Sequence, residues 1–149
     1  MDTLTPSQRH KNMSHIRATG GKLEVSLRSQ LFRFGFRFRK NDKRYTGTPD
    51  IVLPHYNAVI FVNGCFWHAH DCSKFKMPKT NTEFWKNKLE KNKARDEKTV
   101  ARLIEEGWRV CIVWECAISG SNKKEKVTDA AEKIAWWLEE EPHELRVEI

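Results

Sequence analysis

The sequence predicts an α/β protein in which helices cover both faces of a small mixed sheet. Short apolar runs typical of strands are grouped in the middle of the 149-residue chain. Segments with helical periodicity precede, separate and follow these runs, an order typical of an α/β/α layered domain. No repeat, Gly/Ser-rich linker or low-complexity tract divides residues 1–149, so we expect a single domain with short tails.

Two helices are predicted before the first strand. The first spans about residues 7–18, because Thr5 and Pro6 place a capping hydroxyl before a proline at the first helical position. The second spans about residues 22–34, where four apolar residues recur at helical spacing. Gly35 follows it at the position of a C-terminal cap.

Three strands are predicted between residues 36 and 62. Residues 36–39 alternate Phe and Arg, which is typical of a strand with one buried face. After a polar loop over residues 41–49, two short apolar runs, 50–53 and 58–62, are separated by Pro54 to Asn57 and predict paired strands.

The last elements are two helices around one strand. A long helix is expected over residues 80–106, with Thr80 and Glu83 in a capping-box pattern. The nearly continuous apolar run 108–114 predicts a strand that is buried on both faces. A final helix spans about residues 123–140, with Asn122 as its cap.

Composition and charge restrict the function. The 27 Lys and Arg residues exceed the 20 acidic ones, giving a net charge of +7, which favours a polyanionic partner. No run approaches the roughly 18 apolar residues of a membrane span, and residues 1–12 lack the apolar core of a secretory signal. We therefore expect no membrane partner and a reducing, intracellular setting, in which the four cysteines are thiols or thiolates rather than disulfides.

One group of residues is a candidate metal site. Cys65, His70, Cys72 and Cys116 offer three sulfurs and one imidazole, a set that suits tetrahedral zinc. Because Cys116 follows the last predicted strand, a metal would join the 65–72 loop to the sheet. The alternative is that the cysteines are buried apolar residues and His70 is an ordinary loop histidine. Cys111, in the middle of the strand, is expected in the core.

A second group is a candidate hydrolytic site. Asp50 stands at the start of a predicted strand, where many nucleases hold Mg²⁺ against a phosphate, since this hard cation prefers oxygen ligands. His68 lies just outside the zinc set and is a candidate to activate a water. Glu24, on the second helix, is a candidate to orient that histidine. The alternatives are a simple turn at Asp50 and a solvated carboxylate at Glu24.

Four separated motifs are specific enough to compare with a known family: residues 63–72 (NGCFWHAHDC), 82–85 (TEFW), 107–110 (GWRV) and 113–116 (VWEC). Together they resemble the motifs of the very-short-patch-repair (Vsr) endonucleases. The agreement runs in the same order from about Gln8 to the last helix. The resemblance implies a restriction-endonuclease-like fold and a Mg²⁺-dependent enzyme that nicks one strand of duplex DNA at a T:G mismatch left by deamination of 5-methylcytosine.

The resemblance also implies roles for individual residues. By position, Asp50 binds Mg²⁺ together with the main-chain carbonyl of Val62, and His68 is the catalytic histidine, assisted by Glu24. It implies a structural zinc held by Cys65, His70, Cys72 and Cys116. One departure leaves the rate and the substrate open: Asn63 stands where the family often has a histidine, and it can donate a hydrogen bond but cannot carry a proton near neutral pH.

A further set is implied to contact DNA. It comprises Met13, Phe66, Trp67, Trp85, Arg9, Lys11 and Asn63. The aromatic side chains would wedge between base pairs beside the target, where a mismatch lowers the cost of unstacking. The basic residues of the first and the long helix fit a duplex footprint. The alternatives are core aromatics and a solvated long helix whose lysines pair with Glu90, Asp96 and Glu97.

The expected partner is double-stranded DNA with a mismatch, bound by a monomer in the bacterial cytoplasm, and helper proteins of mismatch repair are further candidate partners. Two other functions stay open. One is a restriction or mobile-element nuclease of the same fold with a different target, because a fold does not fix its substrate. The other is a zinc-stabilised module that binds distorted DNA without cutting it.

Overall fold

The computed structural model describes residues 21–72 and 75–149. Its helices are α2 (Lys22–Arg33), the 3-10 helix η1 (Pro54–Tyr56), α3 (Thr82–Glu105), α4 (Glu115–Ile118) and α5 (Lys123–Glu140). Its strands are β1 (Arg39–Lys40), β2 (Ile51–Leu53), β3 (Ala58–Asn63), β4 (Arg109–Trp114) and β5 (Arg146–Glu148). The helix predicted over residues 7–18, with Arg9, Lys11 and Met13, lies outside the described residues.

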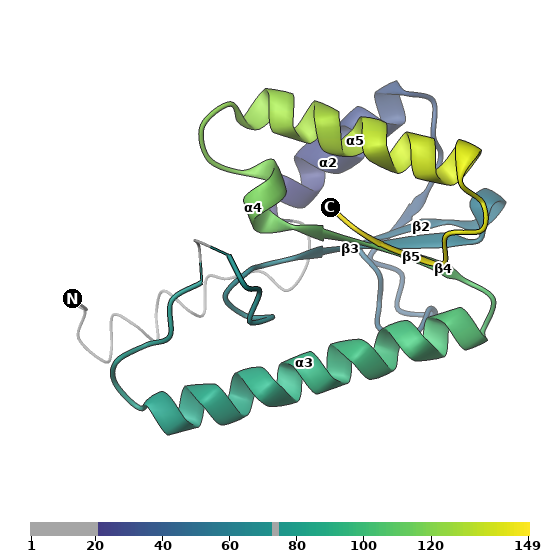
Figure 1. Cartoon of the computed structure of the whole chain (residues 1–149). Coiled ribbons are helices and arrows are strands. Elements are labelled where there is room, and N and C mark those ends of the chain that lie inside the picture. The colour runs from purple at the N-terminus through teal and green to yellow at the C-terminus, as the bar shows by residue number, and fades with distance from the viewer. Residues whose placement is uncertain (1–20, 73–74) are drawn as a thin grey trace.

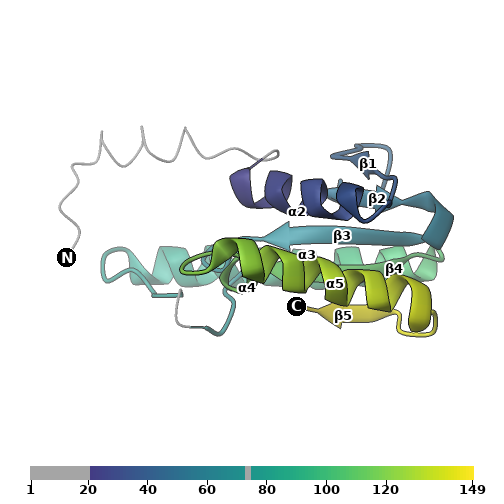
Figure 2. The same cartoon turned by 90° about the horizontal axis from the view of Figure 1, so that it is seen from above.

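The strands form one mixed sheet in the order β1-β2-β3-β4-β5 (Figure 2). Strand β2 runs antiparallel to both of its neighbours, β1 and β3, whereas β3, β4 and β5 run parallel to one another. Strands β3 and β4 pair over their full length, from Ala58 opposite Arg109 to Asn63 opposite Trp114. Their carboxyl ends therefore meet at one edge of the sheet, where the chain continues into the 65–72 loop and into α4.

Helices cover both faces of this sheet, as the sequence predicts. Among the described helices, Figure 1 shows α2, α4 and α5 over one face and α3 over the other. On the first face, Leu27 of α2 and Ile134 of α5 belong to the larger hydrophobic cluster. On the second face, Val100 and Leu103 of α3 pack against the sheet in a smaller cluster. Every helix in the described part of the chain is too short or too polar to span a bilayer.

The strand predicted over residues 36–39 is wrong, because only Arg39 and Lys40 form β1. Gly35 has a φ of 99°, and its N–H donates to the Phe32 carbonyl while the Phe36 N–H donates to that of Leu31. These two bonds end α2 in a Schellman motif. They turn Phe36 into the core, where it is 5% exposed. The alternation of Phe and Arg over residues 36–39 therefore arises from a connection that packs on the core, not from a paired strand.

The ends of other elements also differ from the prediction. Helix α3 begins at Thr82, and Asn81, with a φ of 53°, takes the place expected for Thr80. Asn122 does precede α5, but its side chain forms no capping hydrogen bond. The short elements η1, α4 and β5 carry no periodic pattern long enough to predict.

Candidate active site and metal cluster

A cleft of about 460 Å³ opens between α3 and the sheet, beside the carboxyl end of β3. The ionisable residues that line it are Asp50, His68, Arg95 and Asp96. Asn63, Thr99 and the backbone around Gly47 complete its polar wall. The sequence analysis placed Asp50 and His68 at one site, and both residues line this cleft.

Asp50 is a partly buried carboxylate at the start of β2. Its Oδ2 accepts a hydrogen bond from the Val62 N–H at 2.6 Å, which fixes the carboxyl group against β3. Burial raises the pKa of Asp50 to about 7, although the Val62 N–H opposes this shift. The negative charge of Glu24 adds to the increase, while Arg28 and His68 oppose it. A cation beside Asp50 would therefore stabilise a charge that the protein alone stabilises poorly.

The loop before Asp50 lies close against α3. Gly47 has a φ of 75°, and a Cβ atom there would overlap with the methyl group of Thr99. Thr48 is also left-handed, with a φ of 48°, a conformation that costs energy for a residue other than glycine. Thr46 donates a hydrogen bond to the Glu106 carboxylate at 2.8 Å. These constraints set the direction in which the chain enters β2 and so the place of Asp50.

His68 is paired with a carboxylate that the sequence analysis did not assign to the site. Its Nδ1 contacts the carboxylate of Asp96 on α3. A carboxylate on one ring nitrogen fixes the orientation and the tautomer of an imidazole. The sequence analysis expected Glu24 to orient His68, and gave pairing of Asp96 with lysines of its own helix only as an alternative to DNA binding. The contact joins residues 28 apart on a loop and a helix, and sequence spacing gives no signal for it.

Glu24 is nevertheless close to the cleft. It is 5% exposed on α2, pairs with Arg28 one turn later, and acts on the pKa of Asp50. The alternative of a solvated helix carboxylate is therefore wrong. Arg28 is a second residue that the sequence analysis missed, although its spacing of four from Glu24 is a usable signal.

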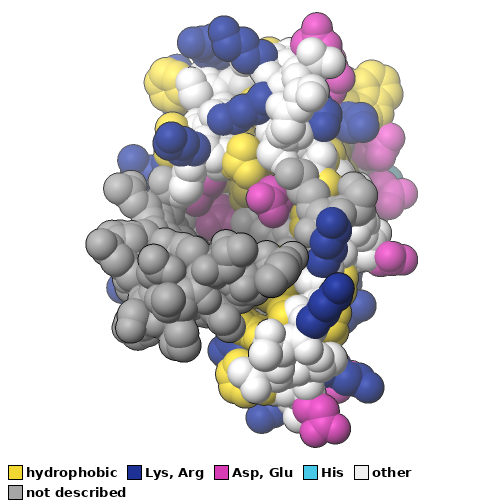
Figure 3. Space-filling view, turned by 90° about the vertical axis from the view of Figure 1, so that its left-hand side faces the viewer, with side chains coloured by type: hydrophobic (Ala, Val, Ile, Leu, Met, Phe, Trp, Pro, Cys, Tyr) yellow, Lys and Arg dark blue, Asp and Glu magenta, His cyan; other side chains and the backbone are white. Residues whose placement is uncertain are grey.

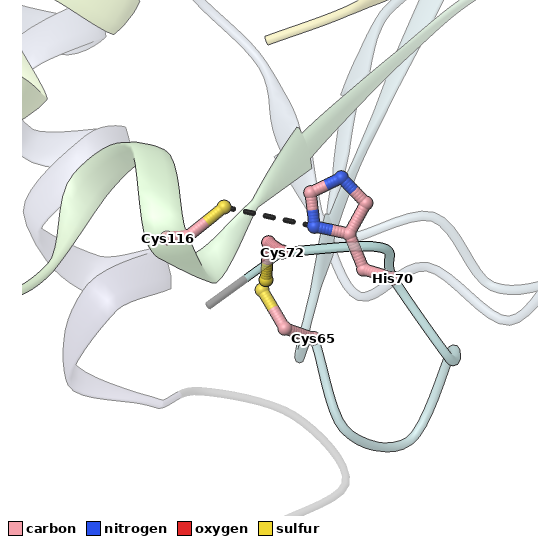
Figure 4. A group of neighbouring side chains, drawn as sticks. All are labelled: Cys65, His70, Cys72 and Cys116. Atoms are coloured by element: carbon pink, nitrogen blue, oxygen red, sulfur yellow. Dashed lines mark hydrogen bonds between the residues drawn. The ribbon is translucent and has the colours of Figure 1, made fainter. Parts of the chain in front are cut away.

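One group of described residues can hold a metal ion: Cys65, His70, Cys72 and Cys116, called the metal cluster below. The sequence analysis singled out the same four residues. The ligand atoms of Cys65, His70, Cys72 and Cys116 all lie within 4.8 Å of one another (Figure 4). The Cys116 Sγ is 3.6 Å from the His70 Nδ1. Tetrahedral zinc with a sulfur at about 2.3 Å and a nitrogen at about 2.0 Å would separate these atoms by roughly 3.5 Å.

The thiols of this cluster differ from the remaining cysteine. Burial raises the pKa of Cys65 to about 12, so its thiolate requires a positive partner, as a bound metal ion would provide. Cys111 is fully buried in the larger hydrophobic cluster and does not belong to the metal cluster, as predicted. The donor set thus fits a soft or borderline metal such as zinc.

Phe66, Trp67 and Trp85 form a small group of rings beside the metal cluster. Their centroids lie 5.1 Å apart for Phe66 and Trp67, 5.5 Å for Phe66 and Trp85, and 5.9 Å for the two indoles. All three side chains are half-buried, and neither hydrophobic cluster of the sheet includes them. They therefore contribute to a partly exposed aromatic surface at the end of α3.

Basic side chains lie around the same end of the molecule. Figure 3 views this end and shows Lys and Arg side chains spread over it, with Asp and Glu side chains near the middle and along the margins. The acids of α3 do not all neutralise its own lysines: Asp96 contacts His68, and Glu97 forms a bidentate pair with Arg146 of β5, at 2.9 Å for both bonds. Exposed Lys and Arg side chains near the cleft are suited to a polyanionic substrate.

The fold and the site define the class of protein: an α/β protein with a carboxylate–histidine cleft and, beside it, four residues that can hold a metal. Comparison with known proteins identifies the family. The model of DNA mismatch endonuclease Vsr matches residues 1–74. DNA mismatch endonuclease Vsr of Escherichia coli is 45% identical over 139 residues, covering 92% of this chain and 87% of that protein. The chain belongs to the Vsr family of DNA endonucleases.

Two further relatives are named as nicking enzymes. Type II nicking enzyme V.NmeAIP of Neisseria meningitidis is 49% identical, over 78% of this chain and 84% of that protein. Type II nicking enzyme V.XorIIP of Xanthomonas oryzae is 44% identical, over 79% of this chain and 87% of that protein. The family that the sequence motifs indicated is therefore confirmed.

Proposed function

We propose that the protein nicks one strand of duplex DNA at or near a T:G mismatch, in a Mg²⁺-dependent reaction on a restriction-endonuclease-like fold. The observation that carries this proposal is the cleft in which Asp50 lies with the His68–Asp96 pair. The printed names of the relatives, a mismatch endonuclease and nicking enzymes, support cleavage of one strand.

Asp50 would hold the catalytic Mg²⁺, with the main-chain carbonyl of Val62 as a second oxygen ligand. The oxygen donors and the volume of the cleft fit a hard cation that keeps several waters. Bound there, Mg²⁺ would stabilise the charge that develops on the phosphate oxygens. The Val62 N–H keeps the Asp50 carboxylate in place, and Glu24 and Arg28 tune the charge that this carboxylate carries.

His68 would take the proton of the attacking water. Asp96 occupies Nδ1, so Nε2 is the nitrogen that accepts this proton, and the same carboxylate stabilises the resulting imidazolium. Arg95, on the wall of the same cleft, would contact a phosphate of the DNA. Asn63, 9% exposed, would donate a hydrogen bond near the scissile group, where the family often has a histidine.

A zinc ion on Cys65, His70, Cys72 and Cys116 would have a structural role. It would join the loop that carries His68 to the start of α4, and so to strand β4. Phe66, Trp67 and Trp85 would wedge into the duplex beside the target. Met13, Arg9 and Lys11 would complete the contacts with DNA, and these three lie outside the described residues.

The test is a cleavage assay on T:G-mismatched, matched and methylated duplexes with Mg²⁺. We expect wild type to nick the mismatched duplex, and Asp50→Ala and His68→Ala each to abolish nicking while the melting temperature stays near that of wild type. Asp129→Ala and His143→Ala, at exposed positions far from the cleft, are matched controls and should nick normally. Retained nicking in both cleft variants would contradict the assigned roles.

The same assay addresses the other functions. Asn63, in place of the histidine frequent in the family, is the observation that favours them. Cleavage without preference for the mismatch would indicate a nuclease with another target. Tight binding to mismatched DNA without cleavage under any divalent metal would indicate a binding module.

A further inference from the structure

Trp114 contacts both histidines of the 65–72 loop. Its indole ring stacks on the His70 imidazole, with centroids 4.0 Å apart and planes inclined by 4°. The same ring meets His68 edge-on, at 6.2 Å and 70°. Stacked and edge-to-face pairs within about 7 Å are favourable arrangements of aromatic rings. One side chain thus contacts a residue of the metal cluster and a residue of the cleft.

The backbone of Trp114 is held by strands on both sides. Trp114 lies opposite Asn63 in the pairing of β3 with β4, and its N–H donates to the Ile149 carbonyl at 3.0 Å. The chain turns into α4 directly afterwards, and the Cys116 Sγ contacts the His70 Nδ1 (Figure 4). The end of β4 therefore fixes the His70 ring twice, through its face and through its ligand nitrogen.

Trp114 also forms part of a second cavity next to the cleft. This cavity, of about 290 Å³, is lined by Trp114, His70, Asn63, His68 and Asp96, among others. The last three of these residues line the cleft as well. The indole ring is half-buried at this wall, where it contacts His70 of the metal cluster and His68 of the cleft.

We propose that Trp114 is a positioning residue that sets the orientations of His70 and His68 together and so couples the metal cluster to the cleft. This inference rests on the proposed function for its effect on nicking. In many metal sites an outer partner fixes the ring of a ligating histidine, and its loss weakens metal binding or activity about 10- to 100-fold. Here the indole stacked on His70 is such an outer partner, and the edge-on contact of the same ring restricts His68.

The test compares zinc release and nicking in full-length variants. Trp114→Leu and Trp114→Met remove the ring but keep an apolar side chain, whereas Trp114→Phe keeps a smaller ring. Trp136→Leu is the matched control, because Trp136 is 60% exposed on α5. Zinc release is followed after addition of excess chelator, and single-turnover nicking of a T:G duplex is measured with Mg²⁺.

We expect the Leu and Met variants to release zinc about 10- to 100-fold faster than wild type and to nick more slowly at unchanged DNA affinity. Trp114→Phe should recover most of both properties, and Trp136→Leu should match wild type. If Trp114→Leu does not fold, Trp114→Met provides the same comparison of a ringless side chain with wild type. Trp114→Phe then distinguishes the role of an aromatic ring from that of side-chain volume.

Unchanged zinc release or unchanged nicking in the folded ringless variant would overturn the proposal, and so would a Phe variant as impaired as Met. Failure of the proposed function would give a different result, because wild type itself would then hold zinc but leave the mismatched duplex intact. The zinc-release comparison would still decide whether Trp114 positions His70.

Discussion

Asp50 determines how the cleft responds to pH. Its carboxyl group ordinarily has a pKa near 3.8, and burial raises this value to about 7. Between these two values the folded, metal-free protein binds a proton that the unfolded chain does not bind. The contribution of Asp50 to stability therefore falls as the pH rises from about 4 to 7, the reverse of an ordinary salt-bridged aspartate.

The pKa of Asp50 predicts a pH-dependent affinity for Mg²⁺. Because the ion binds the ionised carboxylate, the affinity should fall about tenfold as the pH is lowered from 8 to 6. Calorimetric titration of wild type with Mg²⁺ at both values measures this change. Asp50→Asn should bind Mg²⁺ weakly at both pH values. This variant therefore distinguishes an effect of Asp50 on Mg²⁺ affinity from an effect of His68. Equal wild-type affinities at pH 6 and 8 would contradict the prediction.

Asp96 is predicted to be needed for catalysis through His68. Asp96→Asn keeps the shape of the side chain but removes its charge, so it no longer stabilises an imidazolium. We expect nicking to slow by about 100-fold or more, with little change in DNA affinity. Glu97→Gln is the adjacent control, since Glu97 pairs with Arg146 instead. A normal single-turnover rate in Asp96→Asn would remove Asp96 from the mechanism.

The residues of the site differ in how far the sequence reveals them. Cys, His and Asp at defined motif positions indicate Asp50, His68 and the four metal-cluster residues. Asp96 is one of several acids on a charged helix, and its contact with His68 depends on how α3 crosses the sheet. No local pattern encodes that crossing, so Asp96 is recognised only in the folded structure.

Among the elements, the loop from β1 to β2 is predicted to determine the position of Asp50. Gly47→Ala would force a left-handed alanine and an overlap with the Thr99 methyl group. We expect a loss of about 1–3 kcal/mol in stability and slower nicking, measured by urea unfolding and the cleavage assay. Adding Thr99→Ser should recover part of both, because it removes the methyl group but keeps the hydroxyl that donates to the Arg95 carbonyl. Wild-type behaviour of Gly47→Ala would show that the loop has room to move.

Elements with a long periodic or continuous apolar pattern were predicted well. The predicted bounds of α5 are those of the structure, and β4 differs by one residue. The strand over residues 36–39 was wrong because alternation also occurs where a connection packs two phenylalanines inward. Strand β5 is three residues long and gains its stability from pairing with β4, which local sequence does not report.

For the whole molecule, the metal cluster is predicted to be a major source of stability. Cys116→Ser should lose the single zinc equivalent per chain and lower the melting temperature, because loss of one ligand disconnects the 65–72 loop from α4. Cys111→Ala, a buried cysteine outside the cluster, should keep its zinc while losing some stability. Metal analysis and calorimetry measure both properties. A metal-free wild type with an unchanged melting temperature would contradict this role.

The two faces of the sheet are covered by different amounts of buried apolar side chain, and this difference predicts which helix unfolds first on heating. Helix α3 carries Asp96 and Thr99, yet in 24 residues it buries only Leu89, Val100 and Leu103, whereas α2 and α5 share the larger cluster. Regions with few buried apolar contacts open at lower free energy than the rest of a protein. Heat should therefore detach α3 first, so that inactivation precedes global melting and protease cleavage begins along this helix while the remaining layers are still intact.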